Sequence, residues 1–285
     1  MIFSKIAIIG PGLMGGSIAL ALRRKCPDIR IAVWARRDAA VEEVRAAGVA
    51  DTVSSDLEAV VKEAGLVVFC VPIGAMTALA EKIAPLLSPG TLVTDVGSVK
   101  VPVVESLAPV FKNHARFVGS HPMAGSEQTG LAAASPGLFD DAVCIITPDA
   151  SSDPEALEAI GEFWSLLGCR ISSLSPAVHD EVIALVSHLP HLLAATIVNL
   201  VCSQNPNSLN FCGNGFRDTT RVASGSAEMW SEILQSNRES LKKSVEAMIE
   251  KLREVLELLD SGDEARMRQF LTEAKTERDR LKARK

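Results

Sequence analysis

At 285 residues, the chain is long enough for about two domains, and a hydrophobic content of 47% is sufficient for packed cores. Its net charge of −6 argues against a nucleic-acid surface and against long-range attraction of an anionic substrate, so local positive groups have to bind any anion. We expect a cytoplasmic protein, because no run approaches the ~18 apolar residues that would span a bilayer and no basic-then-apolar signal segment opens the chain.

The first predicted elements are a short apolar strand and a helix joined by a glycine-rich turn. Lys5–Ile9 has the composition of a buried strand, and residues 17–22 have a helical pattern. Gly10, Gly12 and Gly15 lie between them in the spacing of a dinucleotide fingerprint. There the first glycine permits a tight turn, the second lets the main chain approach a pyrophosphate, and the third lets helix and strand pack closely. We therefore predict a dinucleotide site rather than a turn without a ligand.

The residues after the second predicted strand, 29–34, bear on the choice of cofactor. Where a Rossmann fold places an acid for the adenosine ribose, this chain has Ala35, followed by Arg36 and Arg37. A carboxylate would bond the ribose hydroxyls and repel a 2′-phosphate, whereas guanidinium groups pair with that phosphate. We therefore favour NADP over NAD. The alternative is NAD, with both arginines in solvent and Asp38 reaching back to the ribose.

Further apolar runs alternate with helical patterns. Residues 38–47 have a helical pattern that ends at Gly48, and buried strands are predicted over 66–71 and 91–96. Continuous apolar strands that alternate with helices indicate a parallel sheet covered on both faces. We expect an α/β fold with a Rossmann-like doubly wound parallel sheet, followed by an all-α helical domain.

Segments just past the predicted strand ends should rim one cleft, because ligands of such sheets collect at the carboxyl ends of the strands. These segments are 71–73, 95–100 and 119–127. The predicted cofactor-binding residues are Gly10, Gly12, Leu13, Met14, Gly15, Arg36, Arg37, Val71 and Pro72.

Four ordered motifs make the pattern more specific: DVGSVK, FVGSHPMAGSE, SPAVHDEVIALVSHLPHLLA and GFRDTTRVA. Together they resemble the prephenate/arogenate dehydrogenase family of tyrosine biosynthesis. The resemblance runs from the glycine turn to about Trp230. It implies oxidation of a cyclohexadienol dicarboxylate: the ring carbon that carries the hydroxyl gives a hydride to nicotinamide, the ring carboxylate leaves as carbon dioxide, and the ring becomes aromatic.

That reaction needs a base for the hydroxyl proton, and His121 is the candidate. By resemblance, Ser98 matches a family serine that hydrogen-bonds both the substrate hydroxyl and this histidine. The structural alternatives are a histidine that caps a turn before Pro122 and a serine that caps a helix ahead of Val99. The motif order favours catalysis for both residues.

A second set of polar residues lies on a predicted helix that begins near Ser175. If this helix is continuous, Ser187 and His191 lie four residues apart on one face, with His188 about 100° round from Ser187. The resemblance implies that Ser187 and His191 bind substrate, whereas His188 either assists or packs, and that His179 lies outside the chemical step. A metal pair is an alternative for His188 and His191, but no third ligand has a suitable spacing, so we expect no metal.

Two arginines after residue 214 supply local positive charge, which an acidic chain needs to bind an anion. Arg221 aligns with a family arginine that holds a substrate carboxylate, where a guanidinium group bonds both oxygens. Arg217 serves either the substrate or the cofactor phosphate. By resemblance, Glu127 borders the substrate site, although an acid in the first turn of a helix is an alternative. The alternative for the arginines is an ordinary ion pair with Asp218 or Glu228.

The chain from residue 226 onward is charged and helical, with a break at Gly262. Apolar residues at spacings of three and four form one stripe: Leu241, Val245, Met248, Leu252, Val255 and Leu259. The stripe packs within the subunit or on a partner, and by resemblance we favour a homodimer. We predict a Rossmann domain over residues 1–173 and a helical substrate-binding and dimerisation domain over residues 174–285, with the linker near 171–175.

Two other functions are compatible with parts of the sequence. One is an NAD(P)-dependent dehydrogenase of the β-hydroxyacid or imine-reducing type, which shares the glycine turn but should lack the GSVK and HPMAG motifs. The other is a non-catalytic dinucleotide sensor, which needs no cluster of histidine, serine and arginine. The motifs favour the prephenate or arogenate reaction, without a choice between the two substrates.

Overall fold

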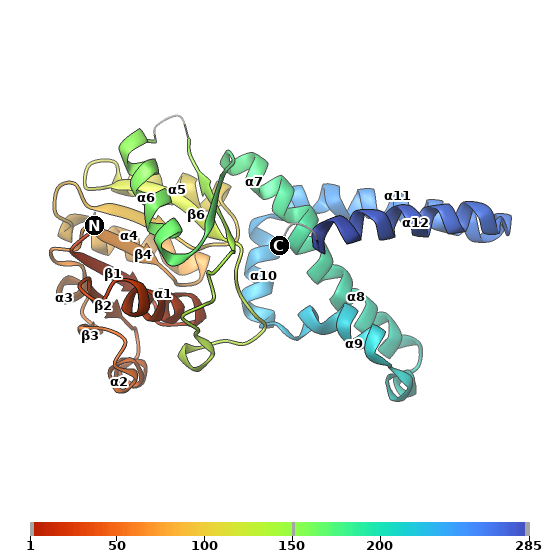
Figure 1. The fold of residues 1–285 in the computed structure, drawn as a ribbon, viewed down its shortest axis with the longest axis horizontal. Helices are drawn as coiled ribbons and strands as arrows, with labels where there is room; N and C mark the ends of the chain where they lie inside the picture. The colour runs from red at the N-terminus through yellow and green to blue at the C-terminus, as the bar shows by residue number, and fades with distance from the viewer. Residues whose placement is uncertain (1–2, 150–151, 283–285) are drawn as a thin grey trace. The chain divides into compact units, whose positions relative to one another are not determined.

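The computed structural model describes residues 3–149 and 152–282 of the chain (Figure 1). These residues divide into two compact units, the first ending at Arg238 and the second beginning at Glu239. The first unit contains the β-sheet and most of the helices, and the second consists of long helices. The domain limits expected from the sequence, 1–173 and 174–285, stay a prediction.

The strands of the first unit are β1 Lys5–Ile9, β2 Arg30–Trp34, β3 Thr52–Ser54, β4 Leu66–Phe69, β5 Leu92–Asp95, β6 Arg116–Pro122, β7 Val143–Thr147 and β8 Arg170–Ser173. Within the described residues they form one sheet in the order β3-β2-β1-β4-β5-β6-β7-β8. All neighbouring pairs are parallel except β6 with β7, which is antiparallel. The chain changes direction of winding between β1 and β4, so the predicted doubly wound fold is confirmed, with one antiparallel pair that was not predicted.

The helices that cover this sheet are α1 Leu13–Lys25, α2 Asp38–Ala47, α3 Leu57–Val61, α4 Ile73–Ile83, α5 Val101–Phe111 and α6 Pro154–Leu167. Alternate residues of β1 point to opposite faces, as the pleat requires. Ile6 and Ile8 share a hydrophobic cluster with side chains of α1 and α6, whereas Ala7 and Ile9 share one with side chains of α3, α4 and α5. Each buried isoleucine stabilises the fold by about 1.5–3 kcal/mol relative to exposure.

Most predicted elements are present, some with shifted ends. β1 and α2 have the predicted limits. The predicted strands 66–71 and 91–96 are shorter at one or both ends, and β4 ends at Phe69 because the chain then turns through Pro72 into α4. The first residues of the segment expected as a linker, 171–175, belong to β8, which ends at Ser173. All four residues of β8 are exposed, so this edge strand has no apolar pattern that predicts it.

The remaining helices are α7 Pro176–Ile183, α8 Leu189–Gln204, α9 Asn214–Thr220, α10 Ala227–Ser236, α11 Arg238–Ser261 and α12 Glu264–Lys282. A π-helical turn, Ala184–His188, joins α7 to α8, and short 3-10 turns lie at Ala84–Leu86, Leu131–Ala133, Pro206–Phe211 and Arg221–Ser224. Ser175 caps α7 as predicted, because its side chain accepts the Val178 N–H. Gly262, with φ +60°, breaks the chain between α11 and α12 as predicted.

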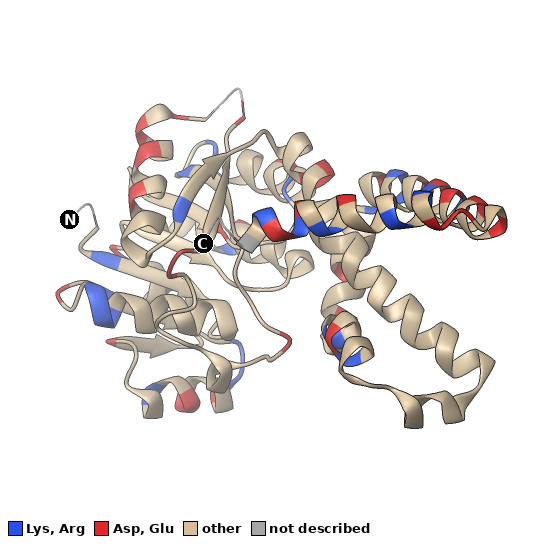
Figure 2. Cartoon of the chain, turned by 45° about the vertical axis from the view of Figure 1, so that its right-hand side comes forward, with Lys and Arg blue, Asp and Glu red and all other residues tan. Residues whose placement is uncertain are grey.

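The continuous helical run Pro176–Gln204 is, by length and composition alone, long and apolar enough to cross a membrane. The expectation that no run approaches the length of a membrane span is therefore wrong by this measure, because polar residues divide the apolar ones of this helix. Figure 2 shows this run almost free of charged residues, in contrast to α11 and α12. However, its polar residues His179, Asp180 and His188 are buried, and all three hydrogen-bond to residues of other elements. Such bonds are typical of a helix packed on protein.

A buried ion pair lies at the carboxyl edge of the sheet, between Asp95 at the end of β5 and Lys100 just before α5. Both side chains are fully buried, and Lys100 Nζ donates to Asp95 Oδ2 and to the Ser120 carbonyl oxygen. Asp95 Oδ2 also accepts the Gly97 N–H at 2.7 Å, and Asp95 Oδ1 accepts the Ser120 N–H at 3.2 Å. The pair therefore holds the 95–100 loop against β6.

Replacing Lys100 with methionine should destabilise the fold by about 3–5 kcal/mol, because the Asp95 carboxylate then stays buried without a cation. The double variant Asp95→Asn/Lys100→Met should recover much of this loss. Urea unfolding followed by circular dichroism measures both changes.

The matched control is Arg116→Met, since Arg116 pairs at 3.4 Å with Asp153 and Glu155 and all three side chains are more than one-third exposed. That change should cost less than about 1 kcal/mol. Equal losses for the Lys100 and Arg116 variants would contradict the importance of the buried pair.

Candidate active site

The glycine turn between β1 and α1 has the geometry of a phosphate cradle. Gly10 has φ +109°, and a Cβ there would lie 2.6 Å from the Cys70 carbonyl oxygen. A Cβ on Gly15 would lie 2.0 Å from the Gly10 carbonyl oxygen, so this glycine permits close packing of the turn. By contrast, no atom lies within 4 Å of the position of a Cβ on Gly12. Gly15 belongs to the first turn of α1, which begins earlier than the predicted helix over 17–22.

Within the described residues, no side chain caps the backbone N–H groups at the N-terminus of α1, where Gly12 is the N-cap residue. The first N–H groups of a helix have no partners within it, and the helix dipole makes this end positive. The turn therefore fits the pyrophosphate of a dinucleotide, with the backbone of Leu13 and Met14 at the helix start.

The other predicted cofactor residues follow neighbouring strands. Arg36 and Arg37 are exposed and follow β2, whereas Val71, half-buried, and Pro72, exposed, follow β4. Both strands pair in parallel with β1, so these residues and the glycine turn share the carboxyl edge of the sheet. Arg37 is the N-cap residue of α2 and caps it with no side-chain bond.

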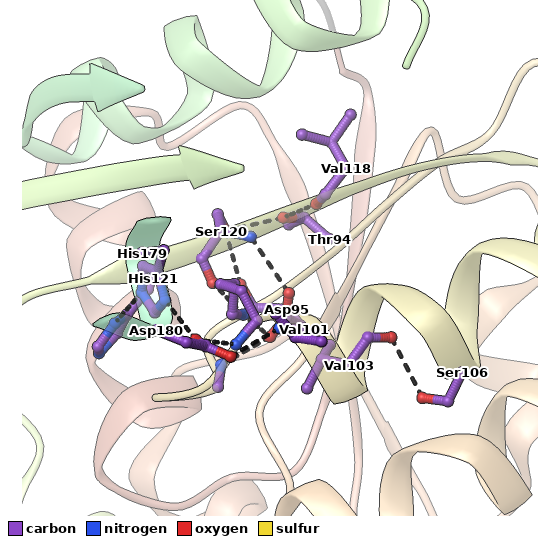
Figure 3. Close-up of polar contacts among 12 residues, drawn as sticks. Thr94, Asp95, Val101, Val103, Ser106, Val118, Ser120, His121, His179 and Asp180 are labelled. Carbon is purple, nitrogen blue, oxygen red and sulfur yellow. Dashed lines mark hydrogen bonds and ion pairs between the residues drawn. The ribbon is translucent and has the colours of Figure 1, made fainter. Parts of the chain in front are cut away.

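His121 lies on β6 and is 7% exposed. Its Nδ1 is 2.8 Å from His179 Nε2, and His179 Nδ1 is 2.7 Å from Asp180 Oδ1 (Figure 3). Burial is the main reason that the pKa of His121 lies well below its ordinary value of 6.5, and repulsion between its charged form and the nearby ionisable groups His179, Lys100 and His188 lowers it further. The imidazole is therefore neutral at neutral pH, as a general base has to be.

The structural alternatives for His121 and Ser98 are wrong. His121 pairs with Ile145 within the sheet instead of capping a turn before Pro122. The N-cap residue of α5 is Lys100, so Ser98 does not cap this helix. Ser98 is half-buried in the loop after β5, a strand that pairs with β6.

Asp180 was not identified from the sequence, and His179 was expected outside the chemical step. In the structure, His179 contacts the candidate base across 58 residues of sequence. Asp180 accepts the Lys100 N–H at Oδ1, 2.7 Å, and the Val101 N–H at Oδ2, 2.9 Å. The adjacent His-Asp pair on an apolar helix is the signal that points to these two residues.

The predicted continuous helix through Ser187 and His191 is wrong in detail. The Leu189 N–H bonds the Ala184 carbonyl oxygen, five residues back, and Ala184–His188 is a π-helical turn. Pro190 has no N–H for the i−4 carbonyl, which accounts for the irregular turn. The extra residue changes the angle between Ser187 and His191, so the spacing of four does not align them as in an α-helix. Ser187 is half-buried, and His191 is buried.

His188 carries its proton on Nε2. Asn237 Nδ2 is 2.8 Å from the Asp180 carbonyl oxygen, which only accepts, and 3.1 Å from His188 Nδ1. The amide nitrogen is the donor in both bonds, so His188 Nδ1 accepts and Nε2 bears the hydrogen. Burial lowers the pKa of His188 to about 4, which keeps it neutral.

Two buried ring nitrogens in this region, His188 Nε2 and His191 Nδ1, have no hydrogen-bond partner within the described parts of the chain. The His191 ring stacks on Trp230, with centroids 3.6 Å apart and an interplanar angle of 12°. Buried polar groups are normally paired, so these two nitrogens fit a polar ligand between α8 and α10.

Arg221 Nη1 lies 2.8 Å from Glu127 Oε2, across 94 residues of sequence. The ion pair predicted as an alternative is present, but with Glu127 instead of Asp218 or Glu228. The Arg221 side chain is 61% exposed and that of Glu127 34% exposed, so water screens the pair. Arg217 is exposed on α9, one helical turn before Arg221. The structure thus pairs Arg221 with Glu127 at the surface and leaves Arg217 exposed on the preceding helix.

Comparisons with known proteins agree with this arrangement. The family model "Prephenate dehydrogenase, nucleotide-binding domain" matches residues 18–173, and "Prephenate dehydrogenase, dimerization domain" matches residues 175–273. A cyclohexadienyl dehydrogenase of Zymomonas mobilis is 36% identical over 92% of this chain and 90% of its own length.

Solved structures of prephenate and arogenate dehydrogenases are similar to this chain over almost its whole length. Prephenate dehydrogenase from A. aeolicus, in complex with hydroxyphenyl propionate and NAD+, is 29% identical, with a TM-score of 0.91 over 98% of each chain. Synechocystis arogenate dehydrogenase is 29% identical, with a TM-score of 0.83 over 97% of this chain and 99% of that chain. The resemblance predicted from the four motifs is therefore confirmed: the chain belongs to the prephenate dehydrogenase family.

Proposed function

We propose that this protein catalyses the oxidative decarboxylation of prephenate or arogenate with a nicotinamide dinucleotide. The observation that carries the proposal is His121, a buried neutral imidazole on β6 at the carboxyl edge of a nucleotide-binding sheet. The names of the relatives, which include cyclohexadienyl, prephenate and arogenate dehydrogenases, support the same reaction.

A bound nicotinamide dinucleotide supplies the hydride acceptor for this reaction. His121 Nε2 takes the hydroxyl proton while the hydride leaves the same ring carbon. The ring carboxylate then leaves as carbon dioxide, and its electron pair makes the ring aromatic. The phenolic oxygen takes a proton back from His121, so substrate and dinucleotide give product, carbon dioxide and reduced dinucleotide with no net proton.

The substrate is a dicarboxylate, and the chain offers it exposed guanidinium groups and buried imidazole nitrogens. Arg221 and Arg217 are exposed, and a guanidinium group bonds two carboxylate oxygens. His188 Nε2 and His191 Nδ1 are buried, and neither has a hydrogen-bond partner within the described residues. We assign substrate binding to these residues, to Ser187 and to Glu127, and we assign the orientation of the hydroxyl group to Ser98.

We also propose that the protein is a homodimer. The helical run Pro176–Gln204 has exposed apolar side chains at Val178, Val182, Leu185, Val186 and Leu200. The first four follow one another within nine residues, so they form an exposed apolar surface that a second copy would cover. The matching family model describes this region as a dimerization domain, which supports the proposal.

Prephenate and arogenate, each tested with NAD+ and NADP+, should give reduced nicotinamide with at least one pair, measured by absorbance. His121→Asn should lower kcat by about 10²–10⁴-fold and leave KM nearly unchanged, because only the base is lost. The pKa of His121 is lowered, so kcat/KM should fall only as the pH drops well below 6.5. Absence of reduction with all four pairs would refute the proposed function.

The glycine turn gives a test of cofactor binding that does not depend on turnover. Gly12→Ala should change the free energy of unfolding by less than about 1 kcal/mol, because the new Cβ meets no protein atom, yet raise the dinucleotide Kd by about tenfold or more. Gly15→Ala should destabilise the fold by about 1–3 kcal/mol, because its Cβ would overlap the Gly10 carbonyl oxygen. Calorimetric titration and urea unfolding measure the two effects. Unchanged affinity of the Gly12 variant would place the phosphates elsewhere.

Arg36 and Arg37 test the preference for NADP. The double change to alanine should raise the Kd for NADP+ by about 10–100-fold, as expected for lost charged hydrogen bonds, and leave NAD+ binding unchanged. Lys82→Ala is the control, because Lys82 lies in the last turn of α4, away from the carboxyl edge. Equal effects on both cofactors, or none, would contradict a role in 2′-phosphate binding.

A further inference from the structure

A chain of hydrogen bonds runs from the backbone of α5 to the candidate base. The Lys100 and Val101 N–H groups donate to Asp180, Asp180 contacts His179 at 2.7 Å, and His179 contacts His121 at 2.8 Å (Figure 3). His179 is fully buried, and Asp180 is 3% exposed. No step of the proposed function requires these two side chains.

The direction of each bond follows from the fixed donors at its start. The backbone N–H groups of Lys100 and Val101 only donate, so both oxygens of Asp180 are acceptors. His179 Nδ1 therefore carries the hydrogen that Asp180 Oδ1 accepts. A neutral imidazole has one such hydrogen, so His179 Nε2 is an acceptor, and the hydrogen between the two rings belongs to His121 Nδ1.

We propose that Asp180 and His179 are positioning residues that hold His121 in the tautomer with an unprotonated Nε2, and this inference rests on the proposed role of His121 as the base. Without them, the neutral ring has two tautomers, and the one with a proton on Nε2 accepts no proton from a hydroxyl group. The same bonds fix the orientation of the ring within β6.

The arrangement also stabilises the ring after proton transfer. The substrate O–H bond breaks as the His121 Nε2–H bond forms, and the resulting imidazolium keeps its Nδ1–H directed at the lone pair of His179. The Asp180 carboxylate lies behind His179, at the positive end of the α5 dipole. When the phenolic oxygen recovers its proton from Nε2, the original tautomer is restored.

The first test measures the tautomer directly in the free, full-length protein. The chain has five histidines, so 15N-histidine labelling gives few signals, and single replacements assign them. We expect His121 to be protonated on Nδ1 and not on Nε2 in long-range 1H–15N spectra. Protonation of His121 on Nε2 would overturn the inference. This result does not depend on the substrate, so it separates a failure of the inference from a failure of the proposed function.

The second test is Asp180→Asn, which places an amide where the carboxylate accepts three N–H groups. An amide nitrogen in the place of Oδ1 reverses both ring bonds and puts the proton of His121 on Nε2, whereas an amide nitrogen in the place of Oδ2 faces the Val101 N–H and leaves the ring bonds as they are. We expect both tautomers of His121 in the spectrum and a lower kcat, with KM within about twofold. An unchanged tautomer together with an unchanged kcat would overturn the inference.

Glu181→Gln is the matched control, because it removes the same charge from the adjacent, exposed position of α7 and should leave kcat within about twofold. If Asp180→Asn does not fold, His179→Gln replaces it. Glutamine presents either its oxygen or its nitrogen to His121, so both tautomers should appear in the spectrum and kcat should fall with KM retained. A single Nδ1–H tautomer with full kcat in this variant would overturn the inference.

Discussion

Lys100 connects two buried carboxylates, and the geometry of the candidate site depends on this connection. Its ammonium group pairs with Asp95 at the end of β5, and its backbone N–H donates to Asp180 on α7. A buried carboxylate without a cation or hydrogen-bond donors costs several kcal/mol, so each acid can stay in the interior only with these partners in place. One residue thereby links the sheet, the start of α5 and the helix that carries His179.

The two carboxylates act on different parts of the chain around His121. Asp95 accepts the Ser120 N–H, and Lys100 Nζ donates to the Ser120 carbonyl oxygen, so the backbone directly before His121 is held by the ion pair. Asp180 acts on the side chain of His121 through His179. The position of His121 and its proton thus depend on separate contacts of Lys100, the first made by its side chain and the second by its backbone N–H.

The sequence predicts those parts of this arrangement that depend on local rules. The glycine turn, β1, α2 and the cap at Ser175 follow from periodicity and from residue-specific backbone preferences, which act over a few residues. The contact of His121 with His179 joins residues 58 apart, and that of Arg221 with Glu127 joins residues 94 apart. Packing decides such contacts, and a single sequence carries no direct signal of packing between distant segments.

The arginines and the histidines of the candidate site differ in burial: the arginines are exposed and charged, whereas the histidines are buried and neutral. A protein of net charge −6 has to attract a dicarboxylate locally, and the role that we propose for Arg221 places this charge on an exposed side chain, where hydration keeps its cost low. Burial lowers the pKa of His121, His179, His188 and His191, so these imidazoles stay neutral and each offers one donor and one acceptor. Neutral rings with fixed hydrogen-bond partners hold one proton arrangement in the free protein. In our proposal, the fold therefore sets the direction of proton transfer before a substrate binds.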